Sequence, residues 1–245
     1  MATETKTISL YNDEIEITFY PKSHHYKLDG RRLIGVTTAL SIINKPALLP
    51  WAANQACNFI IESAKETGTI TMDTVNEARN RWRDVRDQAA ASGTLVHEWV
   101  ENYIKGNDQD MPEDHGILNG VTAFLDWVSE HKIEFISSER IIYSRKHDFV
   151  GTMDAEAVID GKRCVIDFKT SKYIYPEMRY QTAAYQVAAQ EEGSEYDADR
   201  WIVRFDKRDG SFEAKQIGDL KEDFAAFVAA LTLKKREKEI NTLSK

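Results

Sequence analysis

Residues 149–171 read FVGTMDAEAVIDGKRCVIDFKTS, and this stretch decides the predicted fold class. At its centre stand Asp160 and Gly161, the residue pair that a two-residue type I′ hairpin turn prefers. The sequence therefore predicts two antiparallel strands joined by this turn, with Ile159 opposite Lys162.

Strand alternation divides these residues between two faces. One face is apolar and is predicted to contact the core; it carries Met153, Ala155, Ala157, Ile159, Cys164, Ile166 and Phe168. The other face is mainly polar and carries Thr152, Asp154, Glu156, Arg163, Asp167 and Lys169. Near the turn, the alternation is broken by Val158, Lys162 and Val165.

Asp154 lies directly opposite Asp167 in this register, with Cβ atoms about 4.5–5.5 Å apart. Two facing carboxylates are destabilising unless a cation lies between them. Lys169 is on the same face, but one ammonium cannot satisfy both carboxylates, whereas Mg²⁺ or Mn²⁺ prefers such oxygen ligands. The alternative interpretation is the solvated face of an ordinary antiparallel hairpin.

Three other features accompany the hairpin. In GTLVH, Gly93 and His97 are four residues apart, so on a helix the imidazole lies over the missing side chain of the glycine. Gln181 and Tyr185 share one helical face, and both can hydrogen-bond to phosphate or bases. Glu139 begins the strand that leads into the hairpin. Each feature alone also has an ordinary structural explanation, as a core or surface residue.

Taken together and in this order, these motifs resemble the PD-(D/E)XK nuclease superfamily, in its RecB-type branch of exonucleases. That branch has a G-x-x-x-H helix, a G-x-x-D strand, a D-x-K strand and a following Q-x-x-x-Y helix. The matching segments are Gly93 to His97, Gly151 to Asp154, Asp167 to Lys169 and Gln181 to Tyr185. VTTAL (36–40) and the tryptophan of LLPWAANQA (48–56) are also similar to phage-type and mitochondrial genome maintenance exonucleases. Met153 replaces the proline that names the superfamily.

The resemblance implies an α/β fold, restriction-endonuclease-like, with a mixed β-sheet core flanked by helices, an N-terminal hairpin and a helical cover. It implies that Mg²⁺ or Mn²⁺ is bound by His97, Asp154, Asp167 and the backbone carbonyl of Phe168, with Glu139 as a ligand to a second metal or to a water. Lys169 would act with the two aspartates in catalysis, positioning a water or neutralising developing charge. Gln181 and Tyr185 would position the DNA strand.

The composition limits the other classes of function. The 245 residues are 42% hydrophobic and 29% charged, an ordinary globular composition. The net charge of −8 disfavours a uniformly DNA-binding surface but allows local basic patches. Two cysteines are too few for an iron–sulfur cluster or a four-cysteine zinc site. The chain has no apolar run of about 18 residues and no signal-peptide pattern at its start, so we expect a cytoplasmic protein without a membrane partner.

A single nuclease domain is predicted over 1–245, with the N-terminal hairpin and helical cover in 1–90 and the catalytic core in 91–245. The expected elements are strands over 5–36 with a turn at Asp29 and Gly30, and a short helix capped by Thr37 or Thr38. Further helices are predicted over 48–65, 73–104, 117–131 and 176–192, and three strands over 133–170. Two strands around Asp209 and Gly210 and a helix ending near 240 complete the chain.

Basic residues occur in three groups. Arg79, Arg83 and Arg86 are predicted to share one face of the 73–104 helix with Trp82 beside them, a spacing that can track a single DNA strand while the tryptophan stacks on a base. The alternative is a solvated face with pairs such as Glu77–Arg81 and Arg83–Asp87. A second group flanks the first hairpin: Lys22, His24, His25, Lys27, Arg31 and Arg32. The third group, KKREKE at 234–239, is interpreted as a solvated helix end.

The preferred hypothesis is a metal-dependent DNA exonuclease that acts on single strands or free ends in repair, recombination or phage replication. The alternatives are a structure- or sequence-specific endonuclease of the same superfamily, and a nucleic-acid-binding scaffold without activity. The intact set of His97, Asp154, Asp167 and Lys169 favours the two nuclease hypotheses. The sequence predicts neither the polarity of digestion nor any protein partner.

Overall fold

A computed structural model describes residues 5–193, 198–206 and 209–243. The chain divides into two compact units. The first consists of Met1–Ile43 together with Glu98–Lys245, and the second is Asn44–His97. The second unit is therefore an insertion in the sequence of the first, and each is described by itself below.

The first unit begins with a four-stranded antiparallel sheet. Its strands are β1 (Lys6–Leu10), β2 (Ile15–Tyr20), β3 (His25–Leu28) and β4 (Arg31–Arg32), in that order, with a 3₁₀ turn at Pro21–Ser23. Asp29 and Gly30 have φ of 49° and 77°, the positive values that a type I′ turn needs. The predicted hairpin is therefore confirmed, and β1 and β2 extend it.

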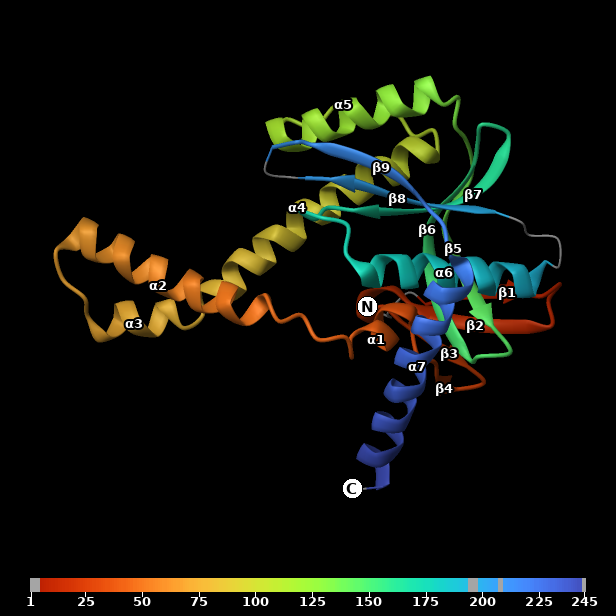
Figure 1. Cartoon of the computed structure of the whole chain (residues 1–245), viewed down its shortest axis with the longest axis horizontal. Coiled ribbons are helices and arrows are strands. Elements are labelled where there is room, and N and C mark those ends of the chain that lie inside the picture. The colour runs from red at the N-terminus through yellow and green to blue at the C-terminus, as the bar shows by residue number, and fades with distance from the viewer. Residues whose placement is uncertain (1–4, 194–197, 207–208, 244–245) are drawn as a thin grey trace. The chain divides into compact units, whose positions relative to one another are not determined.

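The second sheet of this unit is mixed. Its strands are β5 (Glu134–Ser144), β6 (Phe149–Ile159), β7 (Lys162–Lys169), β8 (Asp199–Phe205) and β9 (Phe212–Ile217), in that order. Only β7 and β8 are parallel among these pairs. A parallel pair needs a crossover, which α6 (Pro176–Glu192) provides. The predicted α/β class, with a mixed sheet flanked by helices, is confirmed (Figure 1).

The central hairpin has the predicted turn and register. Asp160 and Gly161 have φ of 51° and 80°, and Ile159 pairs with Lys162. The antiparallel ladder between β6 and β7 runs back to the pair of Ala155 with Ile166. It stops one position before the two aspartates. Beyond that point, the Asp154 carboxylate replaces a backbone carbonyl as the hydrogen-bond acceptor.

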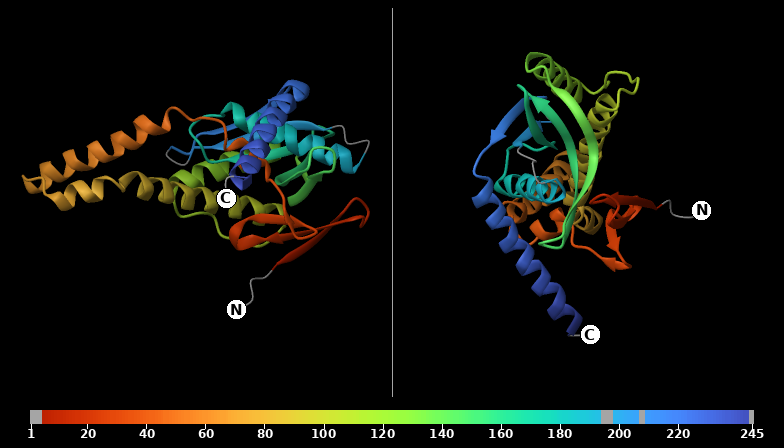
Figure 2. Two further views of the ribbon diagram at one scale, coloured as in Figure 1. Left: turned by 90° about the horizontal axis from the view of Figure 1, so that it is seen from below. Right: turned by 90° about the vertical axis from the view of Figure 1, so that its right-hand side faces the viewer.

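Helices cover both faces of the mixed sheet (Figure 1). On one face lies α5 (His115–Glu130), whose Phe124 ring is centred 5.9 Å from Phe168. On the other face lie α6, α7 (Leu220–Leu243) and the short α1 (Val36–Leu40), and Figure 2 shows α7 continuing beyond the sheet. Gly35 precedes α1 without a side-chain cap, so the prediction that Thr37 or Thr38 caps this helix is wrong.

Met153 corrects one prediction about the hairpin faces. It was expected on the same face as Phe168, which packs against α5, but it packs with Val165 and Tyr185 in the cluster under α6 and α7. The regular alternation fails at this point because the neighbouring strand carries Glu139 with φ of 52°, and because Asp154 has left the ladder.

The second unit is helical. It contains α2 (Leu48–Thr67), α3 (Met72–Ala78) and most of α4 (Arg81–Ile104), which continues into the first unit. The single helix predicted over 73–104 is wrong, because the chain breaks at Arg79 and Asn80. The backbone carbonyl of Asn80 accepts a hydrogen bond of 2.8 Å from the N–H of Arg83, and asparagine is favoured just before a helix rather than inside one. No helix in the described ranges is long and apolar enough to cross a membrane.

Candidate active site

Asp154, Asp167 and Lys169 come together where β6 and β7 stop pairing. The Asp154 carboxylate accepts a hydrogen bond of 2.8 Å from the backbone N–H of Phe168, in place of a backbone carbonyl. The Lys169 ammonium forms an ion pair with the carboxylate of Asp167. The Asp167 side chain is 0% exposed and that of Lys169 is 20% exposed, so the lysine is the accessible member of this pair.

The pKa values at this site reflect burial and mutual attraction. Burial raises the pKa of Asp154, although the charge of Lys169 and the N–H of Phe168 oppose the shift. Burial lowers the pKa of Lys169, but the carboxylates of Asp167 and Asp154 outweigh it and raise the pKa overall. With all three groups ionised, two negative charges face one positive charge. Because burial opposes the ionisation of Asp154, a cation bound between the carboxylates would favour this fully ionised state.

Tyr185 and Gln181 bring α6 to the same site. Tyr185 is buried, and the Gln181 side-chain amide donates a hydrogen bond of 2.7 Å to its hydroxyl. Burial raises the pKa of Tyr185 well above its ordinary value, and the charges of Asp167 and Asp154 raise it further. The phenol therefore stays protonated and retains a hydrogen that it can donate to an anion.

Gly151 makes room for Tyr185. A Cβ atom on Gly151 would lie 2.7 Å from Cε1 of Tyr185 and 3.0 Å from a methyl carbon of Val36. A Cβ contact of 2.7 Å is essentially never observed, so any residue larger than glycine at this position would require the Tyr185 ring to shift. The glycine of the G-x-x-D motif thus has a steric reason in this fold.

Glu139 lies beside the carboxylates on β5 and retains contact with solvent. Partial burial, followed by the charges of Asp154 and Glu101, raises its pKa to about 7, against the opposing effect of Lys105 and Lys6. Glu139 also borders a hollow of about 500 Å³ that Lys6, Glu101 and Arg140 help to line. The structure therefore places it within the electrostatic reach of Asp154.

Replacing Glu139 with glutamine should stabilise the metal-free protein at neutral and alkaline pH. The folded carboxyl has a pKa of about 7 against 4.5 when unfolded, so its contribution to stability is full below about pH 4.5 and is lost as pH rises through about 7. Solvent screening limits the effect to about 1 kcal/mol. In melting curves recorded with a chelator, the melting temperature of the variant should rise relative to that of the parent as pH rises. A difference in melting temperature that does not change with pH would contradict the pKa assigned to Glu139.

His97 is the last residue of the second unit, whereas the carboxylates belong to the first. It therefore stays a predicted ligand. In the described part of the chain, no group of three or more histidine, cysteine, aspartate or glutamate side chains is arranged to hold a metal ion. The oxygen donors that the structure does bring together are Asp154 and Asp167, with the carbonyl of Phe168 between the second aspartate and Lys169 in the chain.

The arginine group of the second unit is smaller than predicted. Arg79 is the C-terminal cap of α3, so it does not share a helix with Arg83 and Arg86, and the three-residue stripe is wrong. The guanidinium carbons of Arg83 and Arg86 lie 5.4 and 5.2 Å from the ring centre of Trp82. The ion pairs formed nearby are Arg81–Asp84 and Arg86–Asp87, at 3.9 and 2.7 Å, rather than the two expected.

Arg83 and Arg86 should contribute to single-strand binding if the remaining pair contacts phosphates. Replacing both with glutamine should then reduce the slope of log affinity against log salt by about 1.4, at about 0.7 for each phosphate released. The control is Arg79→Gln, which removes one charge outside the α4 face and should leave the slope at the parental value. The fluorescence anisotropy of a labelled oligonucleotide in Ca²⁺ measures the salt slope of each protein. A double variant with the parental slope would assign Arg83 and Arg86 to a solvated face.

A buried ion network supports the polar face of the hairpin. Glu156 is 3% exposed and pairs with Arg140 at 3.0 Å and Arg163 at 3.2 Å. Arg140 also pairs with Glu192 at 2.8 Å, which ties β5 and β6 to the end of α6. Sequence reasoning missed this network because alternation shows that Glu156 is on the polar face but not that a helix covers it.

No protein-family model and no curated protein matches the sequence. Among solved structures, a protein described as a candidate exonuclease from Eubacterium rectale is similar over 60% of this chain and 67% of its own, with 14% identity and a TM-score of 0.43. SSO0001 is similar over 49% of this chain and 57% of its own (15% identity, TM-score 0.31). LHK-Exo in complex with dAMP is similar over 62% of this chain and 85% of its own, also with 15% identity and a TM-score of 0.31.

Proposed function

We propose that this protein is a metal-dependent nuclease that hydrolyses phosphodiester bonds in DNA as an exonuclease. The observation that carries the proposal is the grouping of Asp154, Asp167 and Lys169 at the open end of the central hairpin, with Tyr185 behind them. Buried acidic groups held beside a lysine in this way are costly to stability and are characteristic of catalytic sites.

The donor set fits a hard divalent cation. Two carboxylates face one ammonium, so the site has negative charge to share with an added cation, and its donors are oxygens, as Mg²⁺ or Mn²⁺ prefers. Asp154, Asp167 and the Phe168 carbonyl would hold the ion, with His97 and Glu139 as further proposed ligands. When bound, such an ion supplies positive charge to the scissile phosphate and acidifies a nearby water.

The side chains of the site have complementary parts in this chemistry. Lys169, the accessible partner of Asp167, can hold the attacking water by a hydrogen bond or offset the charge that develops on phosphate. The Tyr185 hydroxyl stays protonated and can donate to a phosphate oxygen, and Gln181 orients that hydroxyl from the preceding turn of α6. These residues therefore position the strand and the nucleophile.

The exonuclease form rests on the motif resemblance, and cleavage of open and closed strands tests it. Linear single-stranded DNA with one labelled end should be degraded to short products in Mg²⁺ or Mn²⁺, and not in a chelator. A covalently closed circle of the same sequence should survive. Linearisation of the circle would favour the endonuclease alternative, and the absence of cleavage of any DNA with either metal would favour a binding scaffold.

A further inference from the structure

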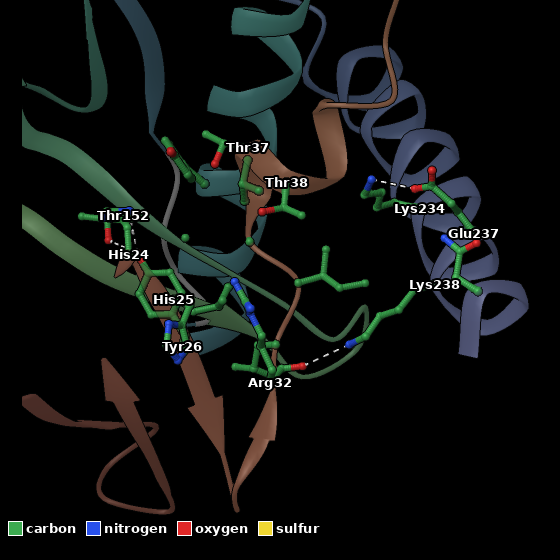
Figure 3. Close-up of a pocket in the computed structure, with 18 of the residues that line it drawn as sticks. His24, His25, Tyr26, Arg32, Thr37, Thr38, Thr152, Lys234, Glu237 and Lys238 are labelled. Atoms are coloured by element: carbon green, nitrogen blue, oxygen red, sulfur yellow. Dashed lines mark hydrogen bonds and ion pairs between the residues drawn. The ribbon is translucent and has the colours of Figure 1, made fainter. Parts of the chain in front are cut away.

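Positive charge without an ion-pair partner lies near the site, in a pocket lined by residues from both ends of the first unit. We call it the basic pocket; it has a volume of about 440 Å³ (Figure 3). Its walls come from β3, β4 and α1 on one side and from the last turns of α7 on the other. The basic side chains that line it are His24, His25, Arg32, Lys234 and Lys238.

One carboxylate, Glu237, accompanies these basic residues, and it pairs with Lys234 at 2.6 Å. Across residues 5–193, 198–206 and 209–243, neither the guanidinium of Arg32 nor the ammonium of Lys238 forms an ion pair. Figure 3 shows Lys238 reaching from α7 toward β4, where its ammonium lies 3.5 Å from the carbonyl of Arg32. Two cations without counter-ions therefore meet in one hollow of a chain whose net charge is −8.

In a neighbouring hollow, by contrast, most arginines are paired with carboxylates of the protein. It has a volume of about 660 Å³ and shares Arg32 and Lys238 with the basic pocket. Its other arginines are neutralised within the protein. Arg31 makes two hydrogen bonds of 2.8 Å to Asp148, and Arg236 pairs with Glu239 at 3.0 Å. Lys235, which lines only the neighbouring hollow, donates a hydrogen bond of 2.7 Å to the carbonyl of His147 and forms no ion pair within the described residues. The charge left for an external anion therefore comes from Arg32, Lys238 and Lys235, and the basic pocket is lined by the first two.

Hydroxyl groups complete the lining. Thr37 and Thr38 lie across the hollow from Arg32, and Thr152 shares a hydrogen bond of 2.6 Å with the Tyr26 hydroxyl (Figure 3). Cations and hydroxyls together are the groups that contact phosphate oxygens in protein–DNA interfaces. The pKa of His25 is lowered by partial burial and then by Arg32 and Lys27, as expected in a positive field.

The basic pocket also adjoins the candidate active site. Gly151 and Tyr185 line it, and Tyr185 lies in the field of Asp154 and Asp167. All of these residues belong to one compact unit. A strand whose phosphate is cleaved beside the aspartates can therefore place another phosphate on the far side of Tyr185.

We propose that the basic pocket binds a backbone phosphate of the DNA strand outside the cleavage site, held by Arg32 from β4 and Lys238 from α7. The inference rests on the proposed function for its ligand, and it makes the C-terminal helix part of the strand-binding surface. The KKREKE run is then more than the solvated helix end predicted from sequence, since Lys238 serves the pocket.

The test compares two double variants with equal loss of charge. Arg32→Gln with Lys238→Gln should lower the affinity for a labelled single-stranded oligonucleotide several-fold in Ca²⁺ and reduce the log–log salt slope by about 0.7, the value for one phosphate. Lys221→Gln with Arg236→Gln removes the same charge from α7 outside the pocket and should keep the parental slope. Arg32→Lys should also keep the slope, and melting curves verify folding.

The outcomes separate this inference from the proposed function. If the parent cleaves DNA but both double variants bind with parental slopes, the pocket assignment is wrong and the nuclease stands. If the parent binds without cleaving and only the pocket variant loses slope, the nuclease proposal is wrong and the pocket assignment stands. Competition with polyglutamate tests an acidic protein partner instead. The DNA assignment would be overturned in favour of such a partner if polyglutamate displaced the oligonucleotide from the parent and not from the pocket variant, at concentrations at which inorganic phosphate displaces it from neither.

Discussion

Replacing Asp167 with asparagine is expected to reduce DNA cleavage by about a thousandfold, since electrostatic stabilisation by a bound metal is worth several kcal/mol and each 1.4 kcal/mol is about tenfold in rate. Asp167 is fully buried against Lys169, so the amide occupies the same space without the charge. Asp154→Asn should reduce cleavage equally. Cleavage of end-labelled DNA in Mg²⁺ and Mn²⁺ measures both losses, and a variant near the parental rate would show that the site is wrongly placed.

The two variants should differ in stability, which separates a catalytic loss from unfolding. Asp154→Asn keeps the Asp167–Lys169 pair and removes a buried charge, while its carbonyl oxygen can still accept from the N–H of Phe168. In a chelator its melting temperature should hold or rise. Asp167→Asn breaks the pair and leaves the ammonium less compensated, so its melting temperature should fall. The reverse order would contradict the charge distribution described for this site.

Substituting alanine for Gly151 is expected to disturb both folding and cleavage. The added Cβ would meet the Tyr185 ring at 2.7 Å and Val36 at 3.0 Å, so α6 or α1 must move. Overpacking of this kind costs about 1–3 kcal/mol of unfolding free energy. Because a shift of about 1 Å in a positioning group can cost about a hundredfold in rate, cleavage should fall by a similar factor.

Gly193→Ala is the matched control for this substitution. Gly193 has φ of −135°, and a Cβ added there meets nothing within 4 Å. Its variant should melt and cleave as the parent does. A Gly151→Ala protein with parental stability and parental cleavage would mean that Tyr185 can move without consequence, and would remove it from the positioning residues.

The central hairpin is predictable because its determinants are local. Asp160 and Gly161 select the turn, the turn sets the register, and the register places Asp154 and Asp167 on neighbouring strands. The same reasoning covers the hairpin at Asp29 and Gly30. These predictions depend only on residues that are adjacent in the sequence, and not on the elements that pack against the hairpins.

Features that depend on distant partners escaped prediction. The face of Met153 depends on the conformation of Glu139 on another strand, and the burial of Glu156 depends on α6. The basic pocket joins Arg32 to Lys238 from the opposite end of the chain. Periodicity along one element cannot show such pairings. The break at Asn80 was local and could have been found, since asparagine favours helix caps over helix interiors.

The β6–β7–α6 succession has a consequence for how such a chain can evolve. Gly151, Asp154, Asp167, Lys169 and Tyr185 all lie on this one uninterrupted run, in the order in which the strands and the crossover helix follow one another. Recombination that transferred only this segment to another protein would move the two carboxylates, the lysine and the tyrosine together, with their spacing unchanged. The proposed ligand His97 and the pocket residue Arg32 lie outside this run, so the receiving protein would have to supply their equivalents.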